Sequence, residues 1–457
     1  MKLSLKLTAT FFLLLGSALS VRAQTSQESN LRATADAACA SAKQLPGVAP
    51  AACRALDIER RQVSGNVYEY TFALQVGEGV HDVIRVHRVV REDEAGQPSP
   101  AEHAVLMVHG DIWGFDAAFL GNTVSAHAPA GQSVGLYLAS RGVDVWGIDL
   151  RWAQVPAATI DLNFMKDWNI ETHVGDIGAA LAVARGVRGA TGSGTGQLAL
   201  LGWSRGGILA YAYANAETRL PETLRQVKAL VPIDIAYKFA PEHEAQRAAA
   251  CRRYASAKQQ RDLGVYHSPQ GAGVGVIGTR AATDPGGIST IPGFAGLNNA
   301  QAALLLASRT HLLFGVDPPV PSYHFNAGVF NLLGLPTGLQ YTPEAYLYDF
   351  FAAARPYQSS TEVVESEALM CDEIDLPYDD YLGEIKIPVL YVGAAGGFGE
   401  YGTGTLARLG GTDVSSLIVR LHANDARAAD FGHADLFMAE NARDAVWKPL
   451  RKWLVSR

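Results

Sequence analysis

One short stretch limits the fold more than any other, because it joins a strand pattern to a helix pattern through a glycine-flanked serine. Residues 198–207 read LALLGWSRGG, so an apolar run of strand length leads into Gly202, Ser204 and Gly206. This order matches the G-x-S-x-G pattern of a sharp strand-to-helix turn, which holds a serine out of the sheet. An ordinary glycine turn is the alternative, and the surrounding pattern favours the sharp turn.

Strand patterns and helical patterns alternate on both sides of this turn. Apolar runs at 104–108, 143–150 and 227–233 are typical of parallel strands that are buried on both faces. A helical pattern at 171–186 precedes the serine's strand, and strand patterns resume at 387–392. The sequence therefore predicts an α/β fold with a doubly wound, mostly parallel sheet.

The chain divides into five predicted parts. Residues 1–23 combine a basic start, a short apolar core and small residues, which is typical of a secretory signal peptide. An uncleaved membrane anchor is the alternative for this segment. Residues 24–64 are predicted to be an arm of uncertain order. Residues 65–235 and 387–457 form the two parts of the core, and 236–386, where the alternation breaks down, form an inserted lid.

Composition and charge limit the kinds of partner that the chain is expected to have. The 48% hydrophobic residues are ample for a large core, and a net charge of -7 comes without any basic run. We therefore expect neither nucleic acid nor an anionic membrane as a partner. No second spanning candidate follows the leader, so no stable membrane insertion of the mature chain is expected. The expected location is secreted or periplasmic, and the oligomeric state is not indicated.

Four cysteines are present, and disulfides persist where exported chains work. The favoured pairing joins Cys39 to Cys53 and Cys251 to Cys371, because each pair then lies within one region of the chain. The two other pairings and free thiols remain alternatives.

Two further patterns concern cofactors. Gly273, Gly275 and Gly278 satisfy G-x-G-x-x-G, but no convincing strand precedes them and no βαβ unit surrounds them. A flexible loop within the glycine-rich stretch 271–287 is the better interpretation. The twelve histidines show no ligand spacing typical of a metal site. We therefore predict neither a cofactor nor a metal.

Several motifs together resemble the α/β-hydrolase superfamily. They are HGDIWGFD after one strand, LASRGVDVWGIDLRW around the next, GWSRGG at the turn and DFGHADLF near the end. Their spacing is similar to that of lid-bearing lipases and esterases of the acid-lipase type. The resemblance covers 104–234 and 387–457 and leaves the lid unmatched. It implies that Ser204 is a nucleophile and that His433 is its general base.

The resemblance also implies an oxyanion hole, and it leaves the acid open. The oxyanion would be bound by the backbone amide of Asp111 or Ile112, together with that of Arg205. The loop after the strand at 387–392, where the acid is usually found, offers only Glu400, several residues late. Asp234 ends the strand next to that of the serine, a position used in a minority of these folds. We favour Asp234, with Glu400 as the alternative acid.

These inferences predict an exported serine hydrolase that cleaves a carboxylic ester or lactone of a moderately hydrophobic substrate. The reaction would pass through an acyl-enzyme and need no cofactor. Two alternatives remain. One is a lyase or another non-hydrolytic use of the same fold, and the other is a catalytically inactive binding protein.

Overall fold

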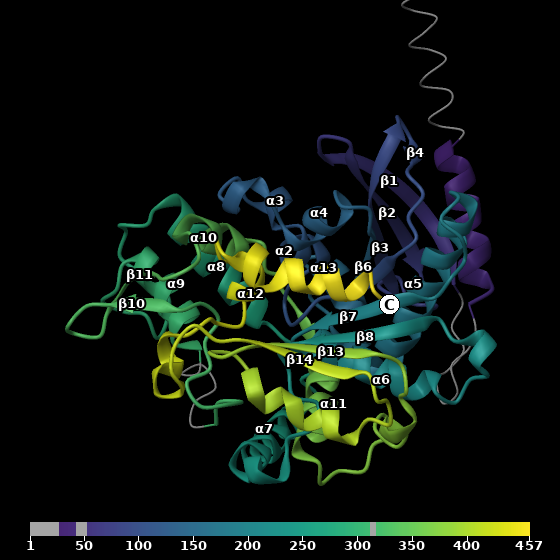
Figure 1. Ribbon diagram of the computed structural model, residues 1–457. Helices are drawn as coiled ribbons and strands as arrows, with labels where there is room; N and C mark the ends of the chain where they lie inside the picture. The colour runs from purple at the N-terminus through teal and green to yellow at the C-terminus, as the bar shows by residue number, and fades with distance from the viewer. Residues whose placement is uncertain (1–26, 43–52, 311–316) are drawn as a thin grey trace, which may run out of the picture.

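The computed structural model describes residues 27–42, 53–310 and 317–457, and a ten-stranded sheet runs through its centre (Figure 1). The strands are β1 (Arg54–Ser64), β2 (Val67–Gln75), β3 (Val83–Glu94), β4 (Gln97–Pro98), β5 (Ala104–Val108), β6 (Asp144–Asp149), β7 (Leu198–Trp203), β8 (Val227–Ile233), β13 (Val389–Ala394) and β14 (Val414–Val419). Their order is β1-β2-β3-β6-β5-β7-β8-β13-β14, with β4 paired to β3. The six neighbouring strands β6, β5, β7, β8, β13 and β14 run parallel to one another. The strands β1, β2 and β3 pair antiparallel, and β3 also pairs antiparallel with β6. The predicted α/β fold with a mostly parallel sheet is confirmed.

Helices cover both faces of this sheet. On one face lie α5 (Ile170–Ala190) and α6 (Arg205–Glu217), and on the other lie α4 (Val134–Ala139) and α13 (Lys448–Leu454). Each face carries its own cluster of buried apolar side chains, because the parallel strands are apolar on both sides. Within the described residues, no helix is both long and apolar enough to cross a bilayer.

The segment after the predicted signal peptide is more regular than the sequence suggests. Residues 27–40 are helical, and the eleven-residue strand β1 pairs antiparallel with β2 through nine residue pairs. A disulfide joins Cys39 to Cys53. The described part of 24–64 is therefore regular, where the sequence leaves its order open. The strand escaped notice because Ala55 is its only fully buried side chain, so apolar alternation is weak. The predicted signal peptide lies outside the described residues.

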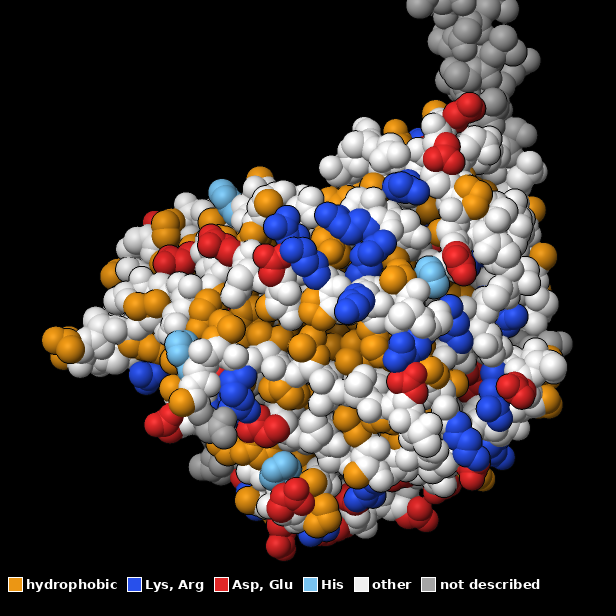
Figure 2. Space-filling model, viewed as in Figure 1, with side chains coloured by type: hydrophobic (Ala, Val, Ile, Leu, Met, Phe, Trp, Pro, Cys, Tyr) orange, Lys and Arg blue, Asp and Glu red, His pale blue; other side chains and the backbone are white. Residues whose placement is uncertain are grey.

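The region between β8 and β13 is mainly helical. It contains α7 (Glu244–Asp262), α8 (Gln270–Thr283), α9 (Asn299–Ser308), α10 (Glu344–Ala352), α11 (Ser360–Cys371), the paired strands β9 (His267–Ser268) and β12 (Gln358–Ser359), and the hairpin β10 (Gly328–Phe330) and β11 (Pro336–Leu339). Figure 1 shows α8, α9 and α10 grouped with the hairpin at one end of the molecule. Hydrophobic side chains colour the protruding tip there in Figure 2, and Leu332 and Leu333 of the hairpin are exposed.

The glycine-rich stretch forms a helix, which corrects the predicted flexible loop. Helix α8 packs along α10, and its glycines allow the two backbones to approach. A Cβ on Gly278 would lie 2.2 Å from the Ala352 nitrogen, and one on Gly271 would lie 1.7 Å from the Arg355 carbonyl oxygen. The glycines of the G-x-G-x-x-G pattern therefore belong to a helix that packs closely on its neighbour.

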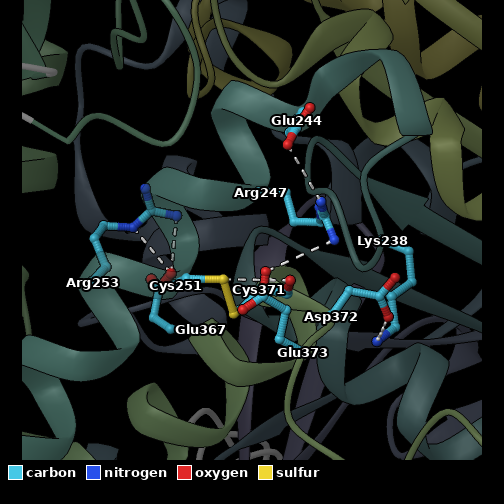
Figure 3. Close-up of a disulfide and its surroundings, with 9 residues drawn as sticks. All are labelled: Lys238, Glu244, Arg247, Cys251, Arg253, Glu367, Cys371, Asp372 and Glu373. Atoms are coloured by element: carbon cyan, nitrogen blue, oxygen red, sulfur yellow. Dashed lines mark hydrogen bonds and ion pairs between the residues drawn. A yellow bond between two sulfur atoms is a disulfide. The ribbon is translucent and has the colours of Figure 1, made fainter.

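The second disulfide, Cys251 to Cys371, ties α7 to the end of α11 (Figure 3). Beside it Arg253 of α7 pairs with Glu367 of α11, with 2.9 Å between nitrogen and oxygen. Both favoured cysteine pairings are thus confirmed. The predicted boundaries of the lid at 236 and 386 stay a prediction.

Candidate active site

Ser204 lies in the turn between β7 and α6 with φ 57° and ψ −131°, a conformation that costs energy for any residue except glycine. Its amide donates to the Ile233 carbonyl at 2.9 Å, which holds the turn against β8. A Cβ on Gly202 would lie 2.1 Å from the Gly206 carbonyl oxygen. A Cβ on Gly206 would lie 2.3 Å from the Val108 carbonyl oxygen. Close backbone approach therefore explains glycine at both positions of the pattern.

The predicted base and the favoured acid are in contact. The Nδ1 of His433 lies 2.7 Å from Oδ2 of Asp234, and both side chains are buried. A carboxylate only accepts hydrogen bonds, so the imidazole donates from Nδ1. In neutral His433 the other nitrogen, Nε2, then carries a free lone pair, which is the form that a general base needs.

Backbone amides hold the Asp234 carboxylate in place. Its Oδ1 accepts from the amides of Ala394 and Gly399 at 2.8 and 3.0 Å, and its Oδ2 accepts from Phe398 at 3.1 Å. A Cβ on Gly397 would lie 1.9 Å from Oδ2, so the loop closes tightly over the carboxylate. The loop after β13 thus surrounds this carboxylate with donors.

The alternative acid, Glu400, points elsewhere. Its carboxylate pairs with Arg420 at 2.8 Å and with Arg427 at 3.5 Å, and 42% of the side chain is exposed. Of the two carboxylates considered from the sequence, the structure brings Asp234 and not Glu400 to His433.

Aromatic side chains from two parts of the chain fix the His433 ring. It stacks on Trp203, the residue before the serine, with ring centroids 5.0 Å apart. Phe325 and Tyr323 of the lid lie 5.3 and 5.4 Å from it. The His433 amide also donates to the carbonyl of His324 at 3.0 Å. These lid residues were missed from the sequence, because nothing in the unmatched lid indicates which segment returns to the site.

The predicted oxyanion loop lies against the serine. A Cβ on Gly110 would be 2.7 Å from the Cβ of Ser204, so only glycine fits there. Ile112 has a positive φ of 54°, and its carbonyl accepts from the Arg355 amide at 2.7 Å. In the part of the chain that the structure describes, the amides of Asp111 and Ile112 donate to no protein acceptor. The arrangement leaves these donors free for a ligand.

An ion pair joins this loop to the other predicted donor, Arg205, whose amide opens α6. The guanidinium of Arg205 makes two hydrogen bonds to the Asp111 carboxylate, at 2.6 and 3.0 Å. Gln358 of the lid donates to the same carboxylate at 2.5 Å. Bidentate pairs fix geometry as well as charge, so this pair holds the two amide-bearing segments at a fixed separation.

His109 supports the same loop from beneath. Its Nε2 accepts from the Leu150 amide at 3.1 Å, which leaves Nδ1 to donate to the Gly110 carbonyl at 2.9 Å. Burial lowers the pKa of His109, so the ring stays neutral in this tautomer. The histidine therefore orients Gly110, because both of its ring nitrogens are engaged by backbone groups.

Two other clusters among the described residues contain side chains of metal-binding type, and in one of them, Cys251, Cys371 and Glu373, the two cysteines form a disulfide. Ligand atoms of Glu69, His87 and Asp116 lie within 4.8 Å of one another. Burial alone would lower the pKa of His87, but the carboxylates of Asp149 and Glu69 outweigh it and raise the pKa to about 10. The imidazole is then protonated at neutral pH, and Arg61 pairs with both Glu69 and Asp116. These charges fit a closed set of ion pairs better than a metal site.

Comparison with known proteins identifies the fold. No protein-family model and no curated protein sequence matches the chain. A candidate lipase from Sulfolobus solfataricus is similar in structure, with a TM-score of 0.57 and 17% identity over 88% of this chain and 99% of that one. An esterase from Thermogutta terrifontis has a TM-score of 0.34 and 16% identity, over 83% of this chain and 96% of its own. The strand order, the serine turn and the first of these matches define an α/β-hydrolase fold.

Proposed function

We propose that this protein is an exported serine hydrolase that cleaves carboxylic esters of moderately hydrophobic substrates. The observation that carries the proposal is the contact between His433 and Asp234, with the imidazole stacked beside the turn that presents Ser204. A nucleophile, a base and a group that orients the base are the three parts of such a site.

In the proposed reaction the Ser204 hydroxyl oxygen attacks the ester carbonyl, and Nε2 of His433 takes the hydroxyl proton. Asp234 stabilises the imidazolium that forms. The amide of Asp111 or Ile112 and that of Arg205 donate to the oxyanion of the tetrahedral intermediate. When the intermediate collapses, the alcohol leaves with the proton from His433. Water, activated by the same imidazole, then releases the acid from Ser204.

The serine hydroxyl is available for this step. Across the described residues, Ser204 Oγ has no hydrogen-bond partner, so it is not tied to another group. Hydrogen bonds between a nucleophile and its base are often long before substrate binds and tighten in the complex. The Ser204–His433 bond is therefore part of the proposal.

Export is supported by the two disulfides and by the leader pattern of residues 1–23. Disulfides persist in secreted and periplasmic proteins and are rare in the reducing cytosol. We propose the mature chain to be secreted or periplasmic and to act on a small-molecule ester.

A fluorophosphonate probe tests the nucleophile directly. We expect it to label the purified protein and to leave the Ser204→Ala variant unlabelled, while p-nitrophenyl esters are hydrolysed only by the former. Equal labelling of both proteins would exclude Ser204 as the nucleophile. Labelling without ester turnover would favour the non-hydrolytic alternative, and the absence of both would favour an inactive binding protein.

A further inference from the structure

The hairpin of β10 and β11 ends in an apolar turn that protrudes from the molecule (Figure 2). Of the thirteen large hydrophobic side chains that are exposed in the described residues, four lie between 329 and 335. Leu332 and Leu333, at the turn itself, are almost wholly exposed. Residues 326–343 contain no Asp, Glu, Lys, Arg or His, so the hairpin carries no charged side chain of its own. A concentration of uncovered apolar side chains of this kind marks a contact surface.

Asn331 satisfies the backbone donors of this turn from within the turn. Its side-chain Oδ1 accepts from the amides of Leu333 and Leu335, each at 3.0 Å. Its carbonyl accepts from the Gly334 amide at 2.9 Å, and its own amide donates to the Leu335 carbonyl at 3.0 Å. The next residue, Pro336, has no N–H group. Backbone donors that are already paired lose little when water is removed, which is what a lipid environment requires of a loop.

The hairpin is fixed at its root, and a cation lies beside it. The Ala327 amide donates to the buried Asp435 carboxylate at 2.9 Å, and the Gln340 amide donates to the Ala327 carbonyl at 2.8 Å. The guanidinium carbon of Arg309, directly after α9, lies 4.6 Å from the centroid of the Phe330 ring. A guanidinium can bind a phosphate through two hydrogen bonds. An anchored apolar turn with such a cation beside it suits the headgroup and the acyl chains of a phospholipid.

The shape of the hairpin favours a lipid surface over a protein partner. A stable protein interface buries about 800 Å² on each partner, with closely matched shapes. The exposed leucines here occupy one convex turn, which is small beside such an interface. A lipid surface requires no matching shape, because acyl chains rearrange around an apolar group, and contact with a few leucines is enough for shallow attachment.

We propose that this hairpin attaches the protein reversibly to the surface of a phospholipid bilayer. Leu332 and Leu333 enter the boundary between headgroups and acyl chains, and Arg309 binds a lipid phosphate. This contact is distinct from insertion across the bilayer. It also brings the candidate active site to the membrane, because only two residues separate β10 from Phe325, whose ring lies 5.3 Å from that of His433.

Flotation of the purified protein with phosphatidylcholine vesicles tests the attachment. We expect the wild type to float with the vesicles and the double variant Leu332→Ser, Leu333→Ser to lose at least about tenfold in partition coefficient, because burial of each leucine contributes roughly that much. Arg309→Gln should lose only a few-fold. Leu263→Ser is the matched control, because this leucine is also exposed but ends α7, which lies away from the hairpin in Figure 1.

Each outcome decides the proposal. Flotation that the double variant loses and the control keeps supports it, with circular dichroism to show that all variants fold. A wild type that stays unbound, or a double variant that floats equally well, overturns it. A wild-type dimer in light scattering that the double variant abolishes, without flotation, overturns it as well and assigns the turn to a contact between two copies of the chain. Flotation needs no turnover, so a failure of the proposed function leaves this result unchanged.

Discussion

Two loops at the carboxyl end of neighbouring strands each carry a carboxylate, and their surroundings differ sharply. After β8, Asp234 is fully buried, accepts three backbone amides and contacts His433. After β13, Glu400 is half-exposed and pairs with two arginines. The difference teaches that the second loop contributes backbone amides around the carboxylate, while the carboxylate that contacts His433 comes from the first.

The largest expected effect comes from changing the buried carboxylate. Asp234→Asn should lower kcat for p-nitrophenyl butyrate by about 10³–10⁴-fold, because an amide can present its NH2 group to His433 and favour the wrong tautomer. Steady-state kinetics and fluorophosphonate labelling both report this loss. Activity within tenfold of the wild type would remove Asp234 from the proposed triad.

The next effect comes from the loop that encloses the carboxylate. Gly397→Ala places a Cβ within 1.9 Å of Asp234 Oδ2 unless the loop moves. We expect a loss of roughly 10²-fold in kcat, since displacing a catalytic group by about 1 Å has effects of this size. Gly383→Ala is the control, because a Cβ there meets nothing within 4 Å. Equal kinetics in the two variants would mean that the tight approach is dispensable.

A smaller effect is expected from the arginine that braces the second loop. Arg427 donates to the carbonyls of Gly397 and, at 2.8 Å, Pro321, and it lies 3.5 Å from Glu400. Arg427→Met should lower the free energy of unfolding by about 2 kcal/mol, because buried carbonyls lose a charged donor. Urea denaturation measures this change, and kcat of the folded variant should fall only several-fold. A kcat loss as large as that of Asp234→Asn would mean that the second loop matters to kcat as much as the carboxylate of the first.

The smallest effect is expected for Glu400→Gln. Its partly exposed ion pairs contribute at most about 1 kcal/mol, and water screens them. We expect kcat within about twofold of the wild type and a small change in the urea midpoint. A kcat loss of orders of magnitude here, with Asp234→Asn unaffected, would reverse the assignment of the acid.

Much of the core could be predicted from the sequence. The runs at 104–108 and 227–233 form β5 and β8 with those limits, because buried parallel strands are mainly apolar and these two runs end at the polar residues His109 and Asp234. The serine turn follows from glycines that the close backbone approach requires. Local sequence patterns are therefore sufficient to predict these elements of the core.

The remainder depends on contacts between distant parts of the chain. Asp234 and Glu400 both follow the carboxyl ends of neighbouring strands, β8 and β13. The order of residues in the sequence does not say which of the two side chains reaches His433. The sequence predicts a loop for the α8 glycines, because the backbone of α10 that they approach lies some seventy residues further along the chain. Phe325 and Gln358 joined the site through lid packing that no local pattern indicates.

The double use of the Asp111 carboxylate has a consequence for how this lid can evolve. One partner, Arg205, adjoins the nucleophile, and the other, Gln358, belongs to the lid. Replacing the lid with an unrelated segment would remove the second hydrogen bond unless the new segment placed a donor where Gln358 lies. A change of the lid therefore also changes the contacts that hold the Asp111 loop against the start of α6.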